Sequence, residues 1–331
     1  MGITIGILAC LFFIARQTHG LGQACASTSD CSANEVCSSS SCACGAGYYA
    51  ASSACTPVPG GYYPTADISG AVQSPTNYWY MTAMDSDGVN QAAVGYGDYN
   101  TGQGIYLSID SGSTWAASSG AGTSSWVCID MSSDGSTLIA GQGTAGDVMI
   151  STNAGATWST ASIGSTDDWY GVALSSDGTS MAAAAFSGTL YTSSNSGGSW
   201  SSAYSVSEAF YDVAVSSDFT TVVVVGYNVY IATGGSLSFS NAGASAGHYR
   251  RVDCDSDCST IIASRFGSSL IVVSTDSGSS WSEINDAVVS TGNWWGVSSS
   301  SDGTKLTVVG EPGSVFACDL PLKKLSENPL G

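Results

Sequence analysis

Residues 274–281 read STDSGSSW, and three further stretches share this spacing of a serine, an aspartate or asparagine, a glycine and a tryptophan. They are SIDSGSTW at 108–115, STNAGATW at 151–158 and SSNSGGSW at 193–200. A weaker copy, ATGGSLSF at 232–239, fills the one gap of double length. The resulting period of about 40 residues is the size of one four-stranded blade of a β-propeller.

A second marker, the turn sequence S-x-D-G, runs in step with the first. Its aspartates are Asp87, Asp134, Asp177 and Asp302, with altered copies at Asp218 and Asp257. An aromatic residue stands eight positions before each of them, namely Trp79, Trp126, Trp169, Phe210, Tyr249 and Trp294. Because three markers keep one register, the chain is built from repeats.

Each repeat reads as four short strands. The aromatic residue opens the first strand, and S-x-D-G makes a tight turn because Asp bonds nearby backbone and Gly accepts a positive φ. An apolar second strand follows, such as TTVVVVG at 220–226, and the serine–tryptophan motif closes the turn between the third and fourth strands. The pattern predicts an all-β fold, a six-bladed β-propeller over residues 62–319, with seven blades as the alternative. Residues 61–69 are expected to supply the strand that closes the last blade.

The repeats resemble those of the Asp-box, or BNR, propeller superfamily. This superfamily includes sialidases, photosystem assembly factors, sorting receptors and some glycoside hydrolases. The resemblance covers most of the chain and implies the propeller fold. It says little about function, because the Asp box is a structural element.

The chain begins with a sequence typical of an exported protein. Residues 1–20 contain an apolar run, Ile3 to Ala15, of the length of a signal-peptide core and short for a membrane span. One of the 11 cysteines lies in this leader, which leaves an even number, as expected in an oxidising compartment. We therefore expect a secreted or cell-surface protein without a membrane span, ending in a flexible tail at 320–331.

Six cysteines crowd into residues 21–58, a segment too short to fold without disulfides. They are Cys25, Cys31, Cys37, Cys42, Cys44 and Cys55. The stretch CACGAGYYAASSAC at 42–55 resembles the C-terminal half of an EGF-like domain. That resemblance implies the pairs Cys25–Cys37, Cys31–Cys42 and Cys44–Cys55, with a different knot of the same cysteines as the alternative. No acidic residue stands in LGQA before the first cysteine, so we expect no calcium site there.

Candidate binding residues gather at the end of the predicted propeller opposite the S-x-D-G turns. The residues that follow the opening aromatics include Tyr80, Tyr170, Tyr211 and Trp295, and the varied loops add Tyr96, Tyr99, Phe186, Tyr227 and Phe266. Flat aromatic side chains on a neutral, hydroxyl-rich surface suit stacking on sugar rings or anchoring a protein partner. The alternative is packing between blades, which we expect for the first aromatic of each pair.

The three arginines that follow the leader, Arg250, Arg251 and Arg265, all belong to one repeat. In an acidic protein such a cluster suits a carboxylate or sulfate group. The alternative is a local set of salt bridges to Asp253, Asp255 and Asp257.

Four cysteines lie within the repeats. Cys254 and Cys258 flank a turn, and we expect them to form a local disulfide. Cys128 and Cys318 belong to repeats that are not neighbours, so their pairing is left open, an intermolecular bond included.

Known catalytic patterns are weak in this chain. Sialidase chemistry needs arginines from several blades, and we expect none of it. The single histidine after the leader, His248, argues against triad hydrolysis and against histidine metal sites, so we expect neither a metal nor a cofactor. Asp130 and Asp253 occupy equivalent first-strand positions and are the carboxylates available to a glycosidase.

The charge balance of 7 Lys+Arg against 26 Asp+Glu excludes a protein that tracks the phosphates of a nucleic acid. The sequence predicts a non-enzymatic extracellular binding or adhesion module whose aromatic face contacts glycan or protein. One alternative is a self-associating structural subunit of an extracellular matrix, coat or filament. The other is a glycoside hydrolase that uses the channel carboxylates.

Overall fold

The structure is a computed structural model that describes residues 35–38, 41–44, 48–51, 54–57, 79–95, 104–267, 270–284, 293–311 and 314–319. The chain divides into a larger unit that holds the repeats and a smaller unit. No helix long and apolar enough to cross a bilayer occurs among the described residues. The predicted leader (1–20), the tail (320–331) and Tyr99 lie outside them.

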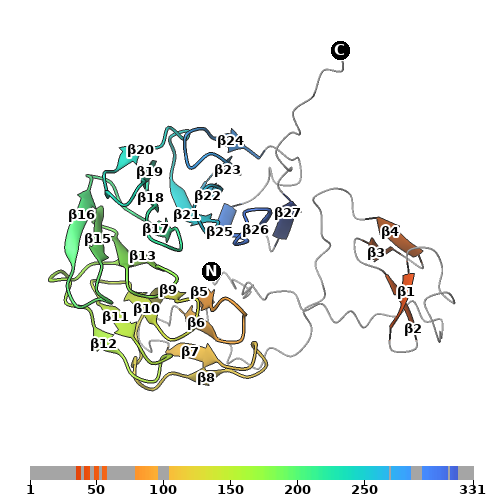
Figure 1. Cartoon of the computed structure of the whole chain (residues 1–331), viewed down its shortest axis with the longest axis horizontal. Coiled ribbons are helices and arrows are strands. Elements are labelled where there is room, and N and C mark those ends of the chain that lie inside the picture. The colour runs from red at the N-terminus through yellow and green to blue at the C-terminus, as the bar shows by residue number, and fades with distance from the viewer. Residues whose placement is uncertain are drawn as a thin grey trace, which may run out of the picture. The chain divides into compact units, whose positions relative to one another are not determined.

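The repeats form antiparallel sheets arranged around a central axis (Figure 1). The first strands, which lie innermost, are β5 (Trp79–Met84), β9 (Trp126–Met131), β13 (Trp169–Leu174), β17 (Asp212–Val215), β21 (Tyr249–Cys254) and β25 (Asn293–Ser299). The second strands are β6 (Gln91–Gly95), β10 (Leu138–Gln142), β14 (Met181–Ala185), β18 (Val222–Val225), β22 (Ile261–Arg265) and β26 (Lys305–Glu311).

The outer half of each sheet is shorter. The third strands are β7 (Ile105–Ser108), β11 (Val148–Ser151), β15 (Thr189–Ser193), β19 (Val229–Ala232), β23 (Ile271–Ser274) and β27 (Ser314–Asp319). The fourth strands, at the rim, are β8 (Ala116–Ala117), β12 (Ser159–Thr160), β16 (Ser201–Ser205), β20 (Ser240–Asn241) and β24 (Ser282–Glu283). The all-β propeller predicted from the repeats is therefore confirmed.

The predicted number of blades is wrong for the described part of the chain. Five blades have four strands, whereas the sequence predicted six or seven blades. The sheet β25–β26–β27 ends at three strands. The segment expected to complete it, 61–69, lies outside the described residues.

The smaller unit contains two antiparallel hairpins. They are formed by β1 (Glu35–Ser38) with β2 (Ser41–Cys44), and by β3 (Tyr48–Ala51) with β4 (Ala54–Pro57). The EGF-like pairings of the six cysteines fall outside what the structure describes, so this module stays a prediction.

The core lies between blades, because the sheets from β9 to β24 have a neighbouring sheet on each side. The second strands accordingly read as continuous apolar runs, and every residue of β14 and β18 is buried. Five of the opening aromatics are buried between blades as expected, namely Trp126, Trp169, Phe210, Tyr249 and Trp294.

The S-x-D-G turns link the blades to one another. The backbone amide of the second residue in each turn donates to the carbonyl of the matching residue in the next blade. These bonds run from Ser86 to Ser133, Ser133 to Ser176, Ser176 to Ser217, Ser217 to Ser256 and Ser256 to Ser301, at 2.8–3.0 Å. The turns thus form a hydrogen-bonded chain that holds the inner strands at one height.

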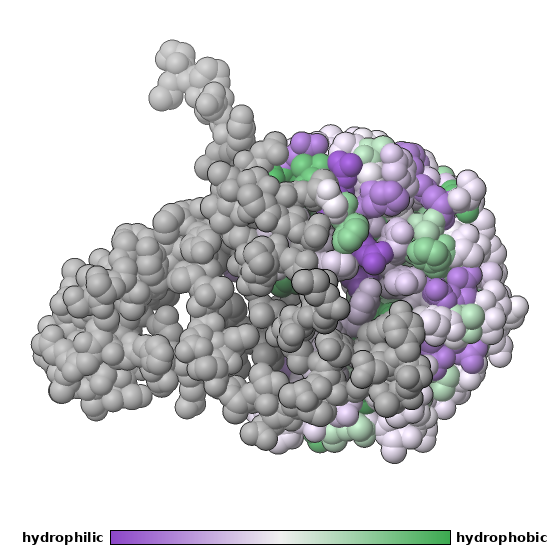
Figure 2. Space-filling model, turned by 180° about the vertical axis from the view of Figure 1, so that it is seen from behind, coloured by the Kyte–Doolittle hydropathy of each residue, from purple (hydrophilic) through white to green (hydrophobic). Residues whose placement is uncertain are grey.

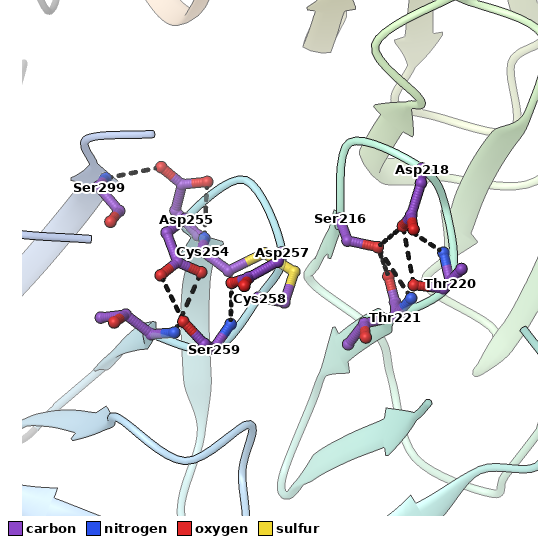
Figure 3. Close-up of a disulfide and its surroundings, with 12 residues drawn as sticks. Ser216, Asp218, Thr220, Thr221, Cys254, Asp255, Asp257, Cys258, Ser259 and Ser299 are labelled. Carbon is purple, nitrogen blue, oxygen red and sulfur yellow. Dashed lines mark hydrogen bonds between the residues drawn. A yellow bond between two sulfur atoms is a disulfide. The ribbon is translucent and has the colours of Figure 1, made fainter. Parts of the chain in front are cut away.

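Two altered turns keep this geometry without glycine. Figure 3 sets them side by side. Phe219 and Cys258 occupy the glycine position with φ of 60° and 53°, a left-handed conformation that costs about 1–2 kcal/mol for a residue with a side chain. Asp218 still accepts hydrogen bonds from the hydroxyl of Ser216 and the amide of Thr220. The bonding of the turn, rather than its glycine, is therefore what every repeat retains.

The serine–tryptophan motif stabilises the outer turn and ties it to the preceding blade. In the copy at 274–281, the Ser274 hydroxyl donates to Asp276 and accepts from the amide of Gly278, both at 2.8 Å. The Asp276 carboxylate accepts from the amide and the hydroxyl of Ser280. The indole of Trp281 donates to the carbonyl of Ala242 at 2.9 Å. The motif is therefore a structural device.

Removal of the Ser274 hydroxyl tests this role. Because Ser274 is buried and its hydroxyl joins Asp276 to Gly278, we expect Ser274→Ala to lower the free energy of unfolding by about 1–3 kcal/mol. The measurement is the urea midpoint at constant m-value. The matched control is Thr275→Ala at the exposed neighbouring position. Equal midpoints for the two variants would refute the structural role.

Candidate functional site

Five of the six inner strands carry a β-bulge at the position that follows the opening aromatic, and β17 is the exception. In β5 the pairing jumps from Trp79 to Met81, and in β21 it jumps from Tyr249 to Arg251. A bulge leaves one residue unpaired and turns its side chain away from the regular alternation. The unpaired residues are Tyr80, Val127, Tyr170, Arg250 and Trp295. They lie at the end of the inner strands opposite the S-x-D-G turns. We call the central axis that the inner strands surround the channel.

Aromatic side chains from neighbouring blades meet at this end of the channel. The rings of Tyr170 and Phe186 are 5.4 Å apart, and Tyr211 lies 6.1 Å from Tyr170 and 5.7 Å from Phe186. A second group consists of Phe266 and Trp295, whose rings are 5.1 Å apart. The distances suit attractive edge-to-face and tilted contacts.

Arg250 joins the two aromatic groups. Its guanidinium carbon lies 4.6 Å from the ring of Tyr211 and 5.9 Å from that of Tyr170. It lies 5.4 Å from Phe266 and 5.8 Å from Trp295, all within the range of cation–π attraction. We call these six residues the mouth cluster: Tyr170, Phe186, Tyr211, Arg250, Phe266 and Trp295.

The other two arginines do not join this cluster. Arg251 is buried, donates at 3.4 Å to the carbonyls of Tyr170 and Tyr211, and lies over the ring of Tyr80. Arg265 donates to the carbonyl of Ala246 at 2.7 Å. The structure therefore gives the three arginines different partners, and for Arg250 and Arg251 the reason is the bulge, which points adjacent residues into different surroundings.

The alternative reading of the arginines, a set of salt bridges to Asp253, Asp255 and Asp257, is wrong. None of the three arginines forms an ion pair within the described ranges. Asp255 and Asp257 bind hydroxyl and amide groups of their own turn instead.

Two members of the mouth cluster, Phe186 and Phe266, come from the varied loops and not from the strand openings. Each follows the last residue of a second strand, and each donates its amide to the residue before the opening aromatic. The signal is their shared position in the repeat. Tyr227 instead contacts His248, with ring centres 5.1 Å apart.

Three carboxylates bind backbone amides across blade boundaries along the channel. Asp130 accepts from the amide of Leu174 at 2.7 Å, and Asp253 accepts from the amide of Ser299 at 2.8 Å. Asp212 accepts from the amide of Val252 at 3.1 Å. Asp130 and Asp253, paired in the sequence argument for a glycosidase, therefore act as links between blades.

Burial raises the pKa of these carboxyl groups, because a charged form loses its water. The pKa of Asp130 rises to about 7, and those of Asp212 and Asp253 rise to about 6. The positive charge of Arg251 lowers the pKa of Asp212, and burial outweighs it. Near neutral pH the channel therefore holds carboxyl groups close to their titration midpoint.

The cysteines of the repeats divide into two kinds. Cys254 and Cys258 form a disulfide across the turn after β21 (Figure 3). Cys128 is a free and fully buried thiol that donates to the carbonyl of Trp169, and burial raises its pKa above the usual range. Its burial excludes an intermolecular bond in the folded state. The side chain of Cys318 lies outside the described residues.

Comparison with known proteins identifies the fold. No protein-family model matches the chain, and no curated protein matches it in sequence. Its structure is similar to a GH74 enzyme of Niastella koreensis, with a TM-score of 0.60 and 17% identity over 75% of this chain and 46% of that one. It is also similar to a GH74 xyloglucanase of Xanthomonas campestris, with a TM-score of 0.58 and 14% identity over 71% of this chain and 44% of that one. The structure of YCF48 bound to a D1 peptide is similar with a TM-score of 0.55 and 12% identity over 82% of this chain and 84% of that one.

The likeness corrects the expectation that the chain is not an enzyme. Propellers with this fold belong to GH74 enzymes, so the repeats do not separate this chain from catalytic propellers. The chain spans less than half the length of these GH74 proteins. At such low identity the likeness shows the fold alone, a β-propeller.

The raised pKa of Asp130 predicts a pH-dependent stability. Between about pH 4 and pH 7 the folded state retains a proton that the unfolded state has lost, so stability falls as pH rises through this window. Asp130→Asn does not titrate. We therefore expect the melting temperature of the wild type, relative to this variant, to be higher at pH 4 than at pH 8.

Scanning calorimetry from pH 4 to pH 8 measures this difference. The control is Asp134→Asn in an exposed turn, where bonds from Ser136 and Ser132 lower the pKa of Asp134 to about 2. The stability that Asp134 contributes is lost only as pH falls toward 2, so its difference from the wild type stays nearly constant above pH 5. Parallel curves for the wild type and Asp130→Asn would refute the assignment.

Proposed function

We propose that the chain is a secreted carbohydrate-binding propeller whose mouth cluster contacts a polysaccharide. The observation that carries the proposal is the pair of aromatic groups from neighbouring blades that lie around Arg250. A sugar ring presents apolar C–H faces, which pack on flat aromatic side chains while its hydroxyl groups remain solvated.

The exposure of the cluster supports this proposal. Phe186 is 41% exposed and Phe266 is 42% exposed, although both are large apolar side chains. Aromatic side chains are enriched at binding surfaces, so two exposed phenylalanines in one cluster mark a candidate surface. The described part of the face in Figure 2 is mostly pale, the colour of weakly hydrophilic residues, and its apolar residues form small separate patches.

The surroundings of the site agree with a glycan partner outside the cell. The predicted leader and the even number of cysteines after it favour export. The fold is shared with proteins described as xyloglucanases, so this kind of propeller is used on polysaccharides. Rigid blades with varied residues at one end supply a surface on which a ligand is recognised.

Alanine variants of the mouth cluster test the proposal. We expect Trp295→Ala and Tyr170→Ala each to weaken polysaccharide binding about tenfold or more, equivalent to about 1.4 kcal/mol. Glycan-array screening selects the polysaccharide, and titration calorimetry measures the affinity. The matched control is Tyr227→Ala, an exposed aromatic residue outside the cluster.

Light scattering on the same sample, with and without reductant, distinguishes a structural subunit. Large self-propagating assemblies with no glycan signal would contradict the proposed binding function. Equal losses of affinity in the two cluster variants and in Tyr227→Ala would show that binding occurs elsewhere.

Glycoside hydrolysis is the second candidate function. The observation in its favour is that Asp130 and Asp253 occupy equivalent positions on two inner strands, with pKa values that burial raises to about 7 and about 6. A carboxyl group that titrates near neutral pH suits a general acid.

The release of new reducing ends from a bound polysaccharide tests this second candidate. We expect Asp130→Asn and Asp253→Asn to abolish any such release while binding at the mouth cluster persists. Release that survives both substitutions would exclude the channel carboxylates as the catalytic groups.

A further inference from the structure

We propose that the polysaccharide bound at the mouth cluster is acidic, and that its carboxylate or sulfate groups bind to Arg250. This inference rests on the proposed function and adds the chemical class of the ligand. It is argued from the contacts of Arg250, from the other charged groups near the mouth and from the placement of the rings.

The guanidinium of Arg250 has no hydrogen-bond acceptor within the described part of the protein. Among the described residues its guanidinium contacts four rings, donates no side-chain hydrogen bond and forms no ion pair. A guanidinium carries its N–H donors in its own plane, so packing against rings leaves those donors available. Two of them match the two oxygens of a carboxylate or sulfate.

The other arginines of the same repeat are committed to backbone carbonyls. Arg251 bonds Tyr170 and Tyr211, and Arg265 bonds Ala246. Arg250 therefore differs from both, because none of its side-chain donors bonds a described carbonyl and its guanidinium lies among the rings of the mouth cluster.

Three carboxylates that are near members of the mouth cluster in the sequence also bind groups other than Arg250. Asp168 accepts from the amide of Ala145, and Asp167 accepts from the amide of Asp168. Glu208 accepts from the hydroxyl of Tyr230 and lies near the amide of Asn228. No described carboxylate lies within ion-pair distance of Arg250, so an anion that arrives with the ligand would be its first counter-charge.

The rings lie on both sides of Arg250. Tyr170, Phe186 and Tyr211 form one group, and Phe266 and Trp295 form the other. This order suits a chain of sugars in which the acidic unit binds Arg250 and its neighbours stack on the two groups.

The S-x-D-G aspartates, which carry part of the net charge of −19, do not oppose this assignment at physiological salt. The S-x-D-G aspartates lie at the far end of the inner strands, whose six residues span roughly 20 Å. The Debye length at 0.15 M salt is about 8 Å, so repulsion from these aspartates is screened at the mouth.

Two matched pairs of polymers test the inference on the wild-type protein at 0.15 M salt. They are polygalacturonate against its methyl ester, and dextran sulfate against dextran. We expect at least one acidic polymer to bind about tenfold or more tightly than its neutral partner. The first pair detects recognition of a carboxylate, and the second detects recognition of a sulfate.

Variants of Arg250 locate the effect. We expect Arg250→Gln to remove the preference for the acidic polymer while affinity for the neutral one changes less than about threefold, and Arg250→Lys to give an intermediate preference. The control is Lys305→Gln, which removes the same charge next to an S-x-D-G turn at the other end of the channel. A melting curve checks that each variant is folded.

The outcomes separate this inference from the proposed function. Equal binding of acidic and neutral polymers by the wild type would overturn the inference and leave the proposed function intact. Binding of polyglutamate in preference to every polysaccharide would assign the site to an acidic peptide. A preference that survives Arg250→Gln and is lost in Lys305→Gln would place the anion elsewhere.

Discussion

The hydrogen bonds between neighbouring S-x-D-G turns set the height of every inner strand. Each bond joins backbone groups alone, from Ser86 in the first repeat to Ser301 in the last. Because the bonds do not involve side chains, the turns at Phe219 and Cys258 keep them without the glycine. Because the turns align one end of the inner strands, the bulges at the opposite end of these strands are aligned with one another as well. The mouth cluster depends on this alignment.

The two consecutive residues that open each inner strand divide between stability and recognition. Trp169 is buried between blades, whereas Tyr170, one position later, lies at the channel mouth. The bulge separates them, since a regular strand would place its next residue on the opposite face of the same sheet. The core and the candidate site are thus built from adjacent positions of one repeat.

The sequence predicted the propeller and the buried opening aromatics because both follow from the period. It placed Tyr170, Tyr211, Arg250 and Trp295 at one end of the channel, and the structure brings these four side chains together. It did not predict the separation of Arg250 from Arg251, because a bulge has no sequence marker of its own. The blade count and the non-enzyme expectation failed because neither a closing strand nor a catalytic role is encoded by the repeat.

The unpaired state of the bulge residues has an evolutionary consequence. A residue outside the ladder of backbone pairing can be exchanged without a change in the register of its sheet. The second blade already carries an aliphatic Val127 where other blades carry an aromatic or a cationic residue. Duplicated genes with this fold can therefore diversify what they recognise, one blade at a time, while selection for foldability acts on the neighbouring positions.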